Sequence, residues 1–85
     1  MSVVTLYTKP GCHLCEDALA ILLRVQARLQ FELIERDITA DDALHRAYFE
    51  RIPVVTLDGQ HLFDYFVDEQ ALIERLESRR WPTTS

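Results

Sequence analysis

Two cysteines, Cys12 and Cys15, lie where a strand pattern in this 85-residue sequence ends and a helix pattern begins. Residues 2–8, SVVTLYT, are rich in β-branched and aromatic side chains and predict a buried strand, which Pro10-Gly11 ends. In residues 13–29 the apolar positions recur at spacings of three and four, which predicts a helix. The sequence thus predicts a Cys-x-x-Cys pair at the start of a helix, directly after a strand. This junction restricts the possible folds more than any other feature of the chain.

A second strand and a short helix follow. Residues 31–38, FELIERDI, predict the strand, and the order strand-helix-strand favours a right-handed parallel crossover. Thr39 and Asp42 match an N-terminal capping pattern, with aspartate in place of the usual Glu or Gln. We expect the helix after them to bury four side chains, those of Ala43, Leu44, Ala47 and Tyr48.

The last third of the chain predicts a hairpin and a final helix. Asp58-Gly59 lies between the runs IPVVTL and QHLF, and such a pair favours a type I′ turn, which needs positive φ at both positions. The last helix begins near Asp68. The order β-α-β-α-β-β-α predicts an α/β fold with a four-stranded mixed sheet and helices on both faces. The first strand is central, the second lies parallel beside it, and the hairpin lies on the other side. We expect one domain over residues 1–80 and a disordered tail over 81–85.

Charge and composition argue against several classes of partner. The formal net charge is −5 and no basic cluster is longer than Arg79-Arg80, so we expect no nucleic acid as partner. The longest strongly apolar run, residues 18–23, is far shorter than the ~20 residues of a membrane span. The N-terminus lacks a charged segment followed by an apolar one, so we expect no signal peptide. With two cysteines and no export signal, we expect the reducing cytoplasm as its compartment. We also expect a monomer.

The predicted position of Cys12 favours its ionised form. A helix N-terminus carries about half a positive charge and several unpaired N–H groups, and Lys9 adds a full charge nearby. A pKa lowered from ~8.5 to ~7 raises the thiolate fraction at pH 7 from about 3% to about 50%. Lower intrinsic nucleophilicity cancels most of this gain, but a sulfur of low pKa also leaves a mixed disulfide readily. Cys15, one helical turn further in, is suited to be the resolving thiol.

Three other roles for the pair have less support. A structural disulfide across this short loop would stabilise the folded state by only ~2 kcal/mol, through its constraint on the unfolded chain. A zinc site needs four ligands, and of His13, His45 and His61 none lies at an H-x₃₋₅-H spacing from another. Two cysteines placed there by chance would leave the strand-helix junction unexplained. Thiol–disulfide chemistry accounts for that junction.

The stretch Y-T-K-P-G-C-H-L-C, residues 7–15, followed by R-I-P-V-V, residues 51–55, resembles the glutaredoxins within the thioredoxin fold. The resemblance covers about residues 3–78. It implies that Cys12 attacks disulfides and that Cys15 is the resolving thiol.

The resemblance also implies a substrate groove. Lys9 would contact a glutathione carboxylate, Pro53 would follow a cis peptide bond and face the active cysteine, and Ile52 would offer backbone groups to the bound thiol substrate. A proline suits that place because it has no N–H to compete for the sulfur. Neither a metal nor a bound cofactor is implied, and glutathione is a candidate reductant.

Two stretches depart from the family pattern. His13 and Leu14 replace the proline and tyrosine that many glutaredoxins have between the cysteines. Where the family has Gly-Gly followed by Cys-Asp, whose backbone and carboxylate hold the γ-glutamyl end of glutathione, this chain has bulky residues that include Tyr65 and Phe66. A backbone that cannot approach the ligand closely loses those contacts, so we do not expect strict glutathione dependence.

Two further sets of residues each allow two interpretations. The aromatic residues Phe63, Tyr65 and Phe66 line a partner-binding surface or fill the core, and in so small a domain we expect at least two of them in the core. The acidic residues Asp37, Asp41 and Asp42 form a metal site or, as we expect, a loop and a helix cap.

The leading hypothesis is a thiol–disulfide oxidoreductase that uses Cys12 and Cys15. Its partners would be a disulfide-containing protein or small-thiol substrate and a thiol reductant. The alternative is a non-catalytic binding module that holds an iron–sulfur cluster or docks a protein.

Overall fold

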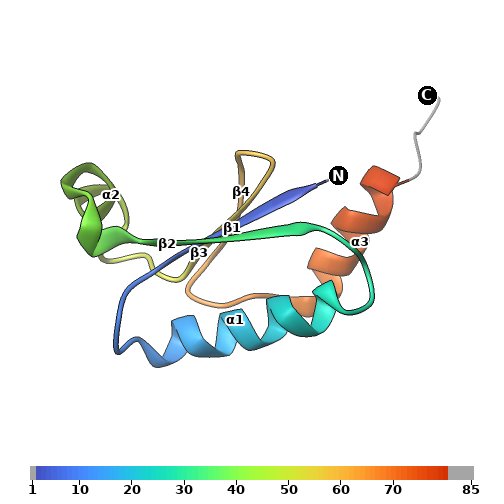
Figure 1. The fold of residues 1–85 in the computed structure, drawn as a ribbon, viewed down its shortest axis with the longest axis horizontal. Helices are drawn as coiled ribbons and strands as arrows, with labels where there is room; N and C mark the ends of the chain where they lie inside the picture. Colours follow the sequence, from blue (N-terminus) through green and yellow to red (C-terminus); the bar gives the residue numbers. More distant parts are fainter. Residues whose placement is uncertain (1, 81–85) are drawn as a thin grey trace.

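A four-stranded mixed sheet in the order β2-β1-β3-β4 forms the centre of the fold (Figure 1). The structure is a computed structural model that describes residues 2–80. Its strands are β1 (Val3–Thr8), β2 (Glu32–Asp37), β3 (Val54–Leu57) and β4 (Gln60–Asp64). β1 pairs parallel with β2 and antiparallel with β3, and β3 pairs antiparallel with β4. The predicted topology, with the first strand central, is confirmed.

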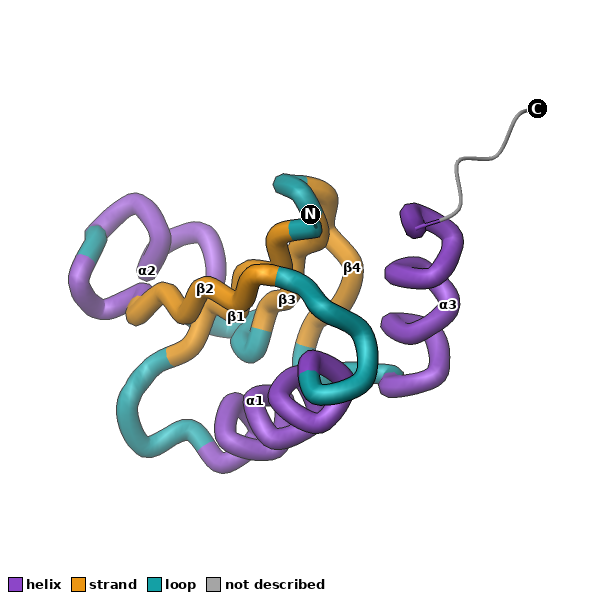
Figure 2. The backbone as a smooth tube through the Cα atoms, turned by 45° about the vertical axis from the view of Figure 1, so that its right-hand side comes forward, coloured by secondary structure: helices purple, strands orange, loops and turns teal. Residues whose placement is uncertain are grey.

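Helices α1 (His13–Gln26) and α3 (Glu69–Arg80) cover one face of the sheet, and α2 (Asp42–Tyr48) lies at one end of the other face (Figure 2). A short 3₁₀ helix, η1 (Ile38–Ala40), leads from β2 into α2. The main core lies under α1 and α3, which bury Ala18, Leu22, Val25, Leu72 and Leu76 against β1 and β3. This arrangement confirms the predicted helices on both faces.

The buried row of α1 is narrower than the sequence suggests. Cys15, Ala18, Leu22 and Val25 are its buried residues, spaced by three and four. Leu14 and Leu23 were expected in the apolar stripe, but 51% and 49% of their surfaces are exposed. The helix also ends at Gln26 rather than at residue 29, because the N–H of Ala27 closes the last turn on Leu23 and Gln26 turns its amide to the carbonyl of Phe31.

The start of α2 differs from the prediction. Its N-cap is Asp41, whose Oδ1 accepts hydrogen bonds from the N–H groups of Ala43 and Leu44, at 2.8 and 3.2 Å. Thr39, the predicted cap, lies inside η1 instead. Within α2 no residue is fully buried: Leu44 and Tyr48 are half-buried, and Ala43 and Ala47 are exposed. Because α2 lies at the end of the sheet, it contacts less of the sheet surface, and fewer of its side chains are buried than the sequence pattern predicts.

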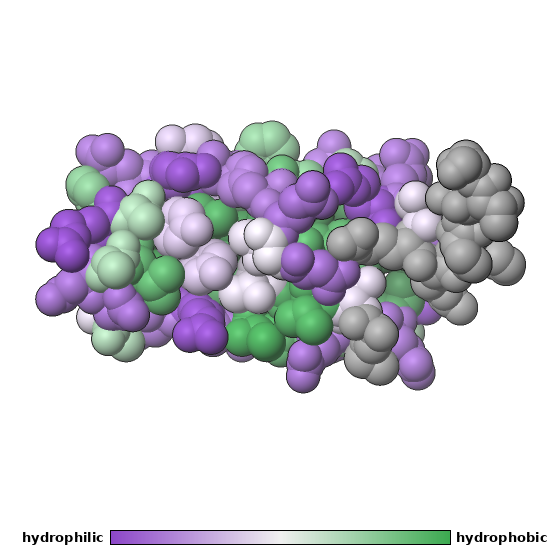
Figure 3. Space-filling view, turned by 90° about the horizontal axis from the view of Figure 1, so that it is seen from above, coloured by the Kyte–Doolittle hydropathy of each residue, from purple (hydrophilic) through white to green (hydrophobic). Residues whose placement is uncertain are grey.

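The part of that face next to α2 stays partly open. Seen from above, hydrophobic side chains lie between hydrophilic ones over the middle of the molecule (Figure 3). Val3, Thr5 and Ile34 alternate with the core-facing residues of their strands, and all three are only half-buried. The sheet therefore depends mainly on α1 and α3 for its cover.

The hairpin turn follows the sequence prediction. Asp58 and Gly59 have φ values of 50° and 85°, which are the two positive values that a type I′ turn requires. The carboxylate of Asp58 accepts a hydrogen bond from the N–H of Val3, at 2.7 Å, and so ties the turn to β1. Further along, Val55 pairs with Phe63 but Thr56 pairs with His61, so Leu62 forms a β-bulge.

The last helix starts where the sequence predicts. Asp68 precedes α3 and caps it by accepting from the N–H of Ala71, as the predicted start near Asp68 implied. The tail over 81–85, with the predicted domain boundary before it, lies outside the described residues. Within residues 2–80, none of the helices has the length and apolar character needed to cross a membrane.

Candidate functional site

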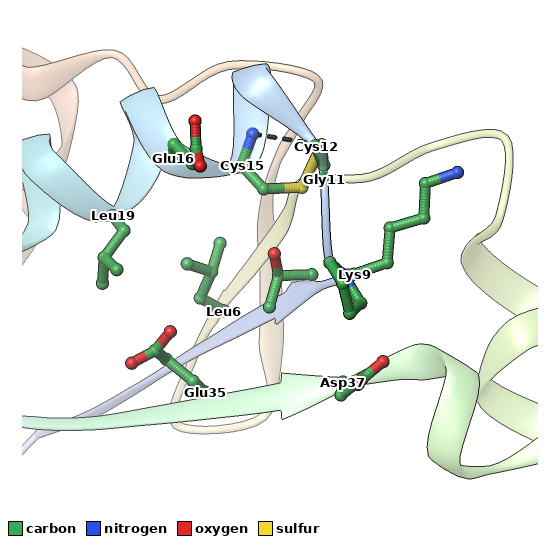
Figure 4. Close-up of a pocket in the computed structure, with 11 residues that line it drawn as sticks. Leu6, Lys9, Gly11, Cys12, Cys15, Glu16, Leu19, Glu35 and Asp37 are labelled. Carbon is green, nitrogen blue, oxygen red and sulfur yellow. Dashed lines mark hydrogen bonds between the residues drawn. A yellow bond between two sulfur atoms is a disulfide. The ribbon is translucent and has the colours of Figure 1, made fainter.

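Cys12 and Cys15 lie together at the N-terminus of α1, where they form a disulfide (Figure 4). Cys12 is the N-cap residue, with extended backbone angles, and its Sγ accepts a hydrogen bond from the N–H of Cys15 at 3.2 Å. The two Cα atoms are 5.2 Å apart, within the ordinary range for a disulfide. Cys12 is half-buried and Cys15 is 2% exposed, so the first sulfur faces the surface and the second faces the interior.

The local chain conformation follows from the residues between β1 and α1. Gly11 has a φ of 78°, a conformation that glycine adopts without steric cost. The turn at Pro10 and Gly11 lets the chain leave the end of the central strand and enter the helix at Cys12. Strand, turn and helix start thus bring the cysteine pair to the carboxyl end of β1.

Behind the disulfide is a small apolar cluster that joins α1 to the segment before β3. Cys15, Ile38 and Ile52 are its buried members, and Tyr7, Leu44 and Tyr48 pack against them. The rings of Tyr7 and Tyr48 have their centroids 4.8 Å apart. The structure therefore brings the predicted substrate residue Ile52 into the same cluster as the cysteines.

The Ile52–Pro53 peptide bond is cis. Both residues are buried, and β3 starts directly after them. The pairing of β3 with β1 includes Val54, the residue directly after Pro53. The resemblance implied this cis bond, and sequence patterns alone would not have suggested it.

A cavity of about 270 Å³ opens beside the disulfide, between α1 and the edge strand β2. The two cysteines and Lys9 line it, together with three carboxylates, those of Glu16, Glu35 and Asp37. In Figure 4, Glu35 points from β2 toward the cavity, whereas the Lys9 side chain extends away from the sulfur atoms. The lining residues of the cavity thus carry more acidic than basic side chains.

Asp37 has a structural role at the cavity rim. Its Oδ1 accepts from both the N–H and the hydroxyl of Thr39, at 2.8 and 2.6 Å, and these hydrogen bonds lower the pKa of Asp37. Asp41 caps α2, as described above. The interpretation of these aspartates as a loop and a helix cap is thus confirmed. Among residues 2–80, no group of three His, Cys, Asp or Glu side chains is placed to hold a metal ion.

The aromatic segment after β4 is mostly on the surface. Tyr65 is 51% exposed and Phe66 is 67% exposed, and only Phe63 packs against the main core. The prediction that at least two of the three fill the core is therefore wrong. The cause is the backbone: Tyr65 has a φ of 70°, and its N–H donates to the carbonyl of Pro53 at 2.8 Å, so its side chain is turned outward.

Sequence reasoning missed two features, of which the first lies beside the disulfide. Glu35 pairs with Leu6 in the parallel register, and its place beside the cavity follows from that register together with the alternation of the strand. Arg51 forms an ion pair with Asp64, thirteen residues later, at 3.2 Å. The alternation of the second strand was a usable signal for Glu35. No sequence signal points to the Arg51–Asp64 pair, because the bulge at Leu62 decides where Asp64 faces.

The sequence matches a family model and curated proteins of mycobacteria. Residues 3–77 match the protein family described as a glutaredoxin-like domain (DUF836). The chain is 31% identical over 74 residues to the uncharacterized protein Rv0508 of Mycobacterium tuberculosis, an alignment that covers 81% of this chain and 76% of that protein.

Solved structures agree with this match. Protein Ne2328 from Nitrosomonas europaea aligns with a TM-score of 0.77 at 32% identity, over 88% of this chain and 91% of that one. Protein XcR50 from X. campestris aligns with a TM-score of 0.70 at 36% identity, over 88% and 96%. A mutant thioredoxin from Halobacterium salinarum, 22% identical, aligns with a TM-score of 0.72 over 96% and 77%, and supports the thioredoxin-like fold alone.

Proposed function

The chain belongs to the family of glutaredoxin-like domains, and from this membership and its Cys12–Cys15 pair we propose that it is a thiol–disulfide oxidoreductase. The observation that carries the proposal is the arrangement of the two sulfurs. One is half-buried at the cap of α1 and the other is buried one turn inside, within bonding distance. This arrangement suits an attacking thiol and a resolving thiol.

The proposed cycle starts from the reduced pair. The thiolate of Cys12 attacks one sulfur of a substrate disulfide, forms a mixed disulfide, and releases the other substrate sulfur as a thiolate that takes a proton from water. Cys15 then loses its proton, attacks the Sγ of Cys12, and releases the second substrate sulfur as a thiol. The substrate gains two electrons and two protons, and the protein ends as the Cys12–Cys15 disulfide. Two equivalents of an external thiol, or one dithiol, return it to the reduced form.

The backbone around Cys12 supports the first step. The N–H of Cys15 points at the Sγ of Cys12, and a hydrogen bond to the charged form of a group favours that form. The partial positive charge at the start of α1 acts in the same direction. Ile52 and Pro53 are the proposed docking residues for the substrate chain, and Lys9 is the proposed contact for a substrate or glutathione carboxylate.

The proposed substrate is a protein disulfide or small-molecule disulfide. By the resemblance, bulky residues that include the exposed Tyr65 and Phe66 occupy the stretch in which glutaredoxins have Gly-Gly. We therefore propose that this chain lacks the backbone contacts to a γ-glutamyl group. A thiol reductant, glutathione or a dithiol, regenerates the pair. We propose that the protein acts as a monomer in the cytoplasm, where thiol reductants are available.

Single-turnover and steady-state assays of three proteins test the proposal. Wild type should reduce hydroxyethyl disulfide and a peptide disulfide, Cys12→Ser should be inactive, and Cys15→Ser should accumulate a mixed disulfide that mass spectrometry detects. Full activity in Cys12→Ser would refute the assignment. A wild-type protein without turnover that binds iron, with visible absorption when purified without oxygen, would support the binding-module alternative instead.

A further inference from the structure

Three polar side chains meet on the sheet face opposite α1. Asp64 lies between Arg51 and His61: the Arg51 Nη2 is 3.2 Å from each carboxylate oxygen, and its Nε is 3.3 Å from Oδ2. The Nε2 of His61 is 2.8 Å from Oδ1. All three side chains are at least partly shielded from solvent, and the carboxylate is the most shielded.

The bulge in β4 makes this meeting possible. Residues three apart on a regular strand face opposite sides of a sheet, so His61 and Asp64 would be separated. The extra residue Leu62 shifts the register, so that His61 pairs with Thr56 and Asp64 pairs with Val54 on the same face. Arg51, just before β3, then reaches the same carboxylate.

The ion pair is continuous with the backbone of the proposed substrate groove. Arg51 directly precedes Ile52-Pro53, and Tyr65 directly follows Asp64. The N–H of Tyr65 donates to the carbonyl of Pro53 at 2.8 Å and to that of Arg51 at 3.3 Å. The same two segments are thus joined twice, once by side chains and once by backbone.

Arg51 also ties this junction to the end of α2. Its own N–H and that of Ile52 both donate to the carbonyl of Tyr48, at 2.8 and 3.1 Å. The guanidinium lies 5.6 Å from the centre of the Tyr48 ring, a cation–π distance. Tyr48 belongs to the cluster behind Cys15, so one arginine connects α2, the groove segment and the end of β4.

We propose that Arg51 and Asp64 are positioning residues for the substrate groove, a clamp that fixes the backbone of Ile52-Pro53, where Ile52 packs in one cluster with the cysteines. This inference rests on the proposed function, because it assigns the clamp to substrate docking. It does not place either residue in contact with the reacting sulfur. The clamp acts through the segment that carries Ile52 and Pro53.

The ionised carboxylate of Asp64 maintains its contact with Arg51 at neutral pH. Burial raises the pKa of Asp64, but hydrogen bonds from His61 and Arg51, together with their charges, outweigh it and hold that pKa below its ordinary value. The carboxylate is therefore ionised, and an ionised carboxylate accepts the two N–H groups of an arginine more strongly than a neutral one.

The test compares Asp64→Asn with a matched control elsewhere in the fold. In the control, Glu69→Gln removes the charge and one acceptor oxygen of the α3 carboxylate to which Arg24 of α1 donates two hydrogen bonds, at 2.6 and 3.1 Å. Steady-state kinetics with a short peptide carrying a mixed disulfide, and amide hydrogen exchange at Tyr65, are measured for both. We expect Asp64→Asn to raise the KM for the peptide about five-fold, the change that loss of one such pair produces, and to raise it more than it lowers kcat.

In the same variant the Tyr65 amide should exchange faster, whereas Glu69→Gln should change neither quantity. Arg51→Lys keeps the charge but not the two-pronged contact, so it should give an intermediate KM and remains available if Asp64→Asn does not fold. Equal KM values for Asp64→Asn and Glu69→Gln, or unchanged exchange at Tyr65, would overturn the clamp. Exchange at Tyr65 is read without turnover, so it decides the clamp even if wild type reduces no disulfide, a result that would refute the proposed function alone.

Discussion

The Sγ of Cys12 accepts a hydrogen bond from the N–H of Cys15 at 3.2 Å, within the first turn of α1. A cysteine in this place does what Ser, Thr, Asn or Asp usually does at an N-cap, which is to satisfy an N–H group that the helix itself leaves unpaired. The residue that starts the helix is therefore also the residue proposed to attack the substrate. Stability of the first turn and ionisation of the thiol are linked through one sulfur.

This link predicts a lowered pKa for Cys12 in the reduced protein. The helix N-terminus and the N–H of Cys15 stabilise the thiolate, so alkylation by iodoacetamide should reach its half-maximal rate near pH 7 rather than at the ~8.5 of free cysteine. The measurement follows modification of Cys12 by mass spectrometry across a pH series in Cys15→Ser. Half-maximal alkylation at the pH of a free thiol would contradict the proposed activation.

The acidic cavity predicts slow reaction with anionic disulfides. Glu35 and Glu16 line the wall beside the cysteines, and glutathione disulfide brings further negative charge to it. Glu35→Gln should raise the rate with glutathione disulfide about two-fold at low salt, with a smaller effect at high salt because ions screen the repulsion.

The matched control for this prediction is Glu32→Gln. It removes the same charge from the same strand, but Glu32 pairs with Val3 at the other end of β2 and alternates to the opposite face. Stopped-flow fluorescence measures both rates. An equal gain from both variants would mean that net charge, and not the cavity wall, controls the reaction.

The Arg51–Asp64–His61 contacts predict an acid-dependent part of the stability. The folded-state pKa of Asp64 is lowered, so its contribution is present above the unfolded-state pKa of about 3.9 and is lost as pH falls through the lower folded-state value. Asp64→Asn should cost about 1 kcal/mol of unfolding free energy at pH 7, and the difference from wild type should shrink below about pH 4. Urea unfolding at several pH values measures it, and a constant difference down to pH 2 would exclude this origin.

Two adjacent leucines of α1 should differ strongly in their effect on stability. Leu22 is fully buried between the helix and the sheet, whereas Leu23 is 49% exposed. Leu22→Ala should lower the free energy of unfolding by roughly 2–5 kcal/mol because it leaves a cavity in the main core. Leu23→Ala should cost below about 0.5 kcal/mol. Chemical denaturation of the two variants compares them directly, and similar losses would mean that α1 packs by another face.

The topology could be predicted because it depends on local patterns. Alternation, helical spacing and the Asp58-Gly59 turn are each set by a few neighbouring residues, and the sheet order expected from them, with the first strand inside the sheet, is the observed one. The cysteine pair was equally visible, since a Cys-x-x-Cys after a strand has one natural place, the helix N-terminus. The strands and helices and the position of the cysteine pair were thus predicted from residues that are neighbours in the sequence.

The predictions failed where a residue's place depends on a distant partner. Tyr65 and Phe66 look like core residues by hydrophobicity, but a backbone hydrogen bond from Tyr65 to Pro53 turns the segment outward. Glu35 reaches the cavity because of its register with Leu6 together with the alternation of the strand. Asp41 replaced Thr39 as a cap because the chain makes a 3₁₀ turn first.

The hairpin register decides which face of the sheet each side chain of β4 occupies. Because successive side chains of a strand alternate between the two faces, a slip of β4 by one residue against β3 would move His61 and Asp64 to the face away from Arg51. A slip by two residues would keep them on their present face. The Asp58-Gly59 turn and the bulge at Leu62, which set this register together, therefore also decide whether the Arg51–Asp64 contact can form.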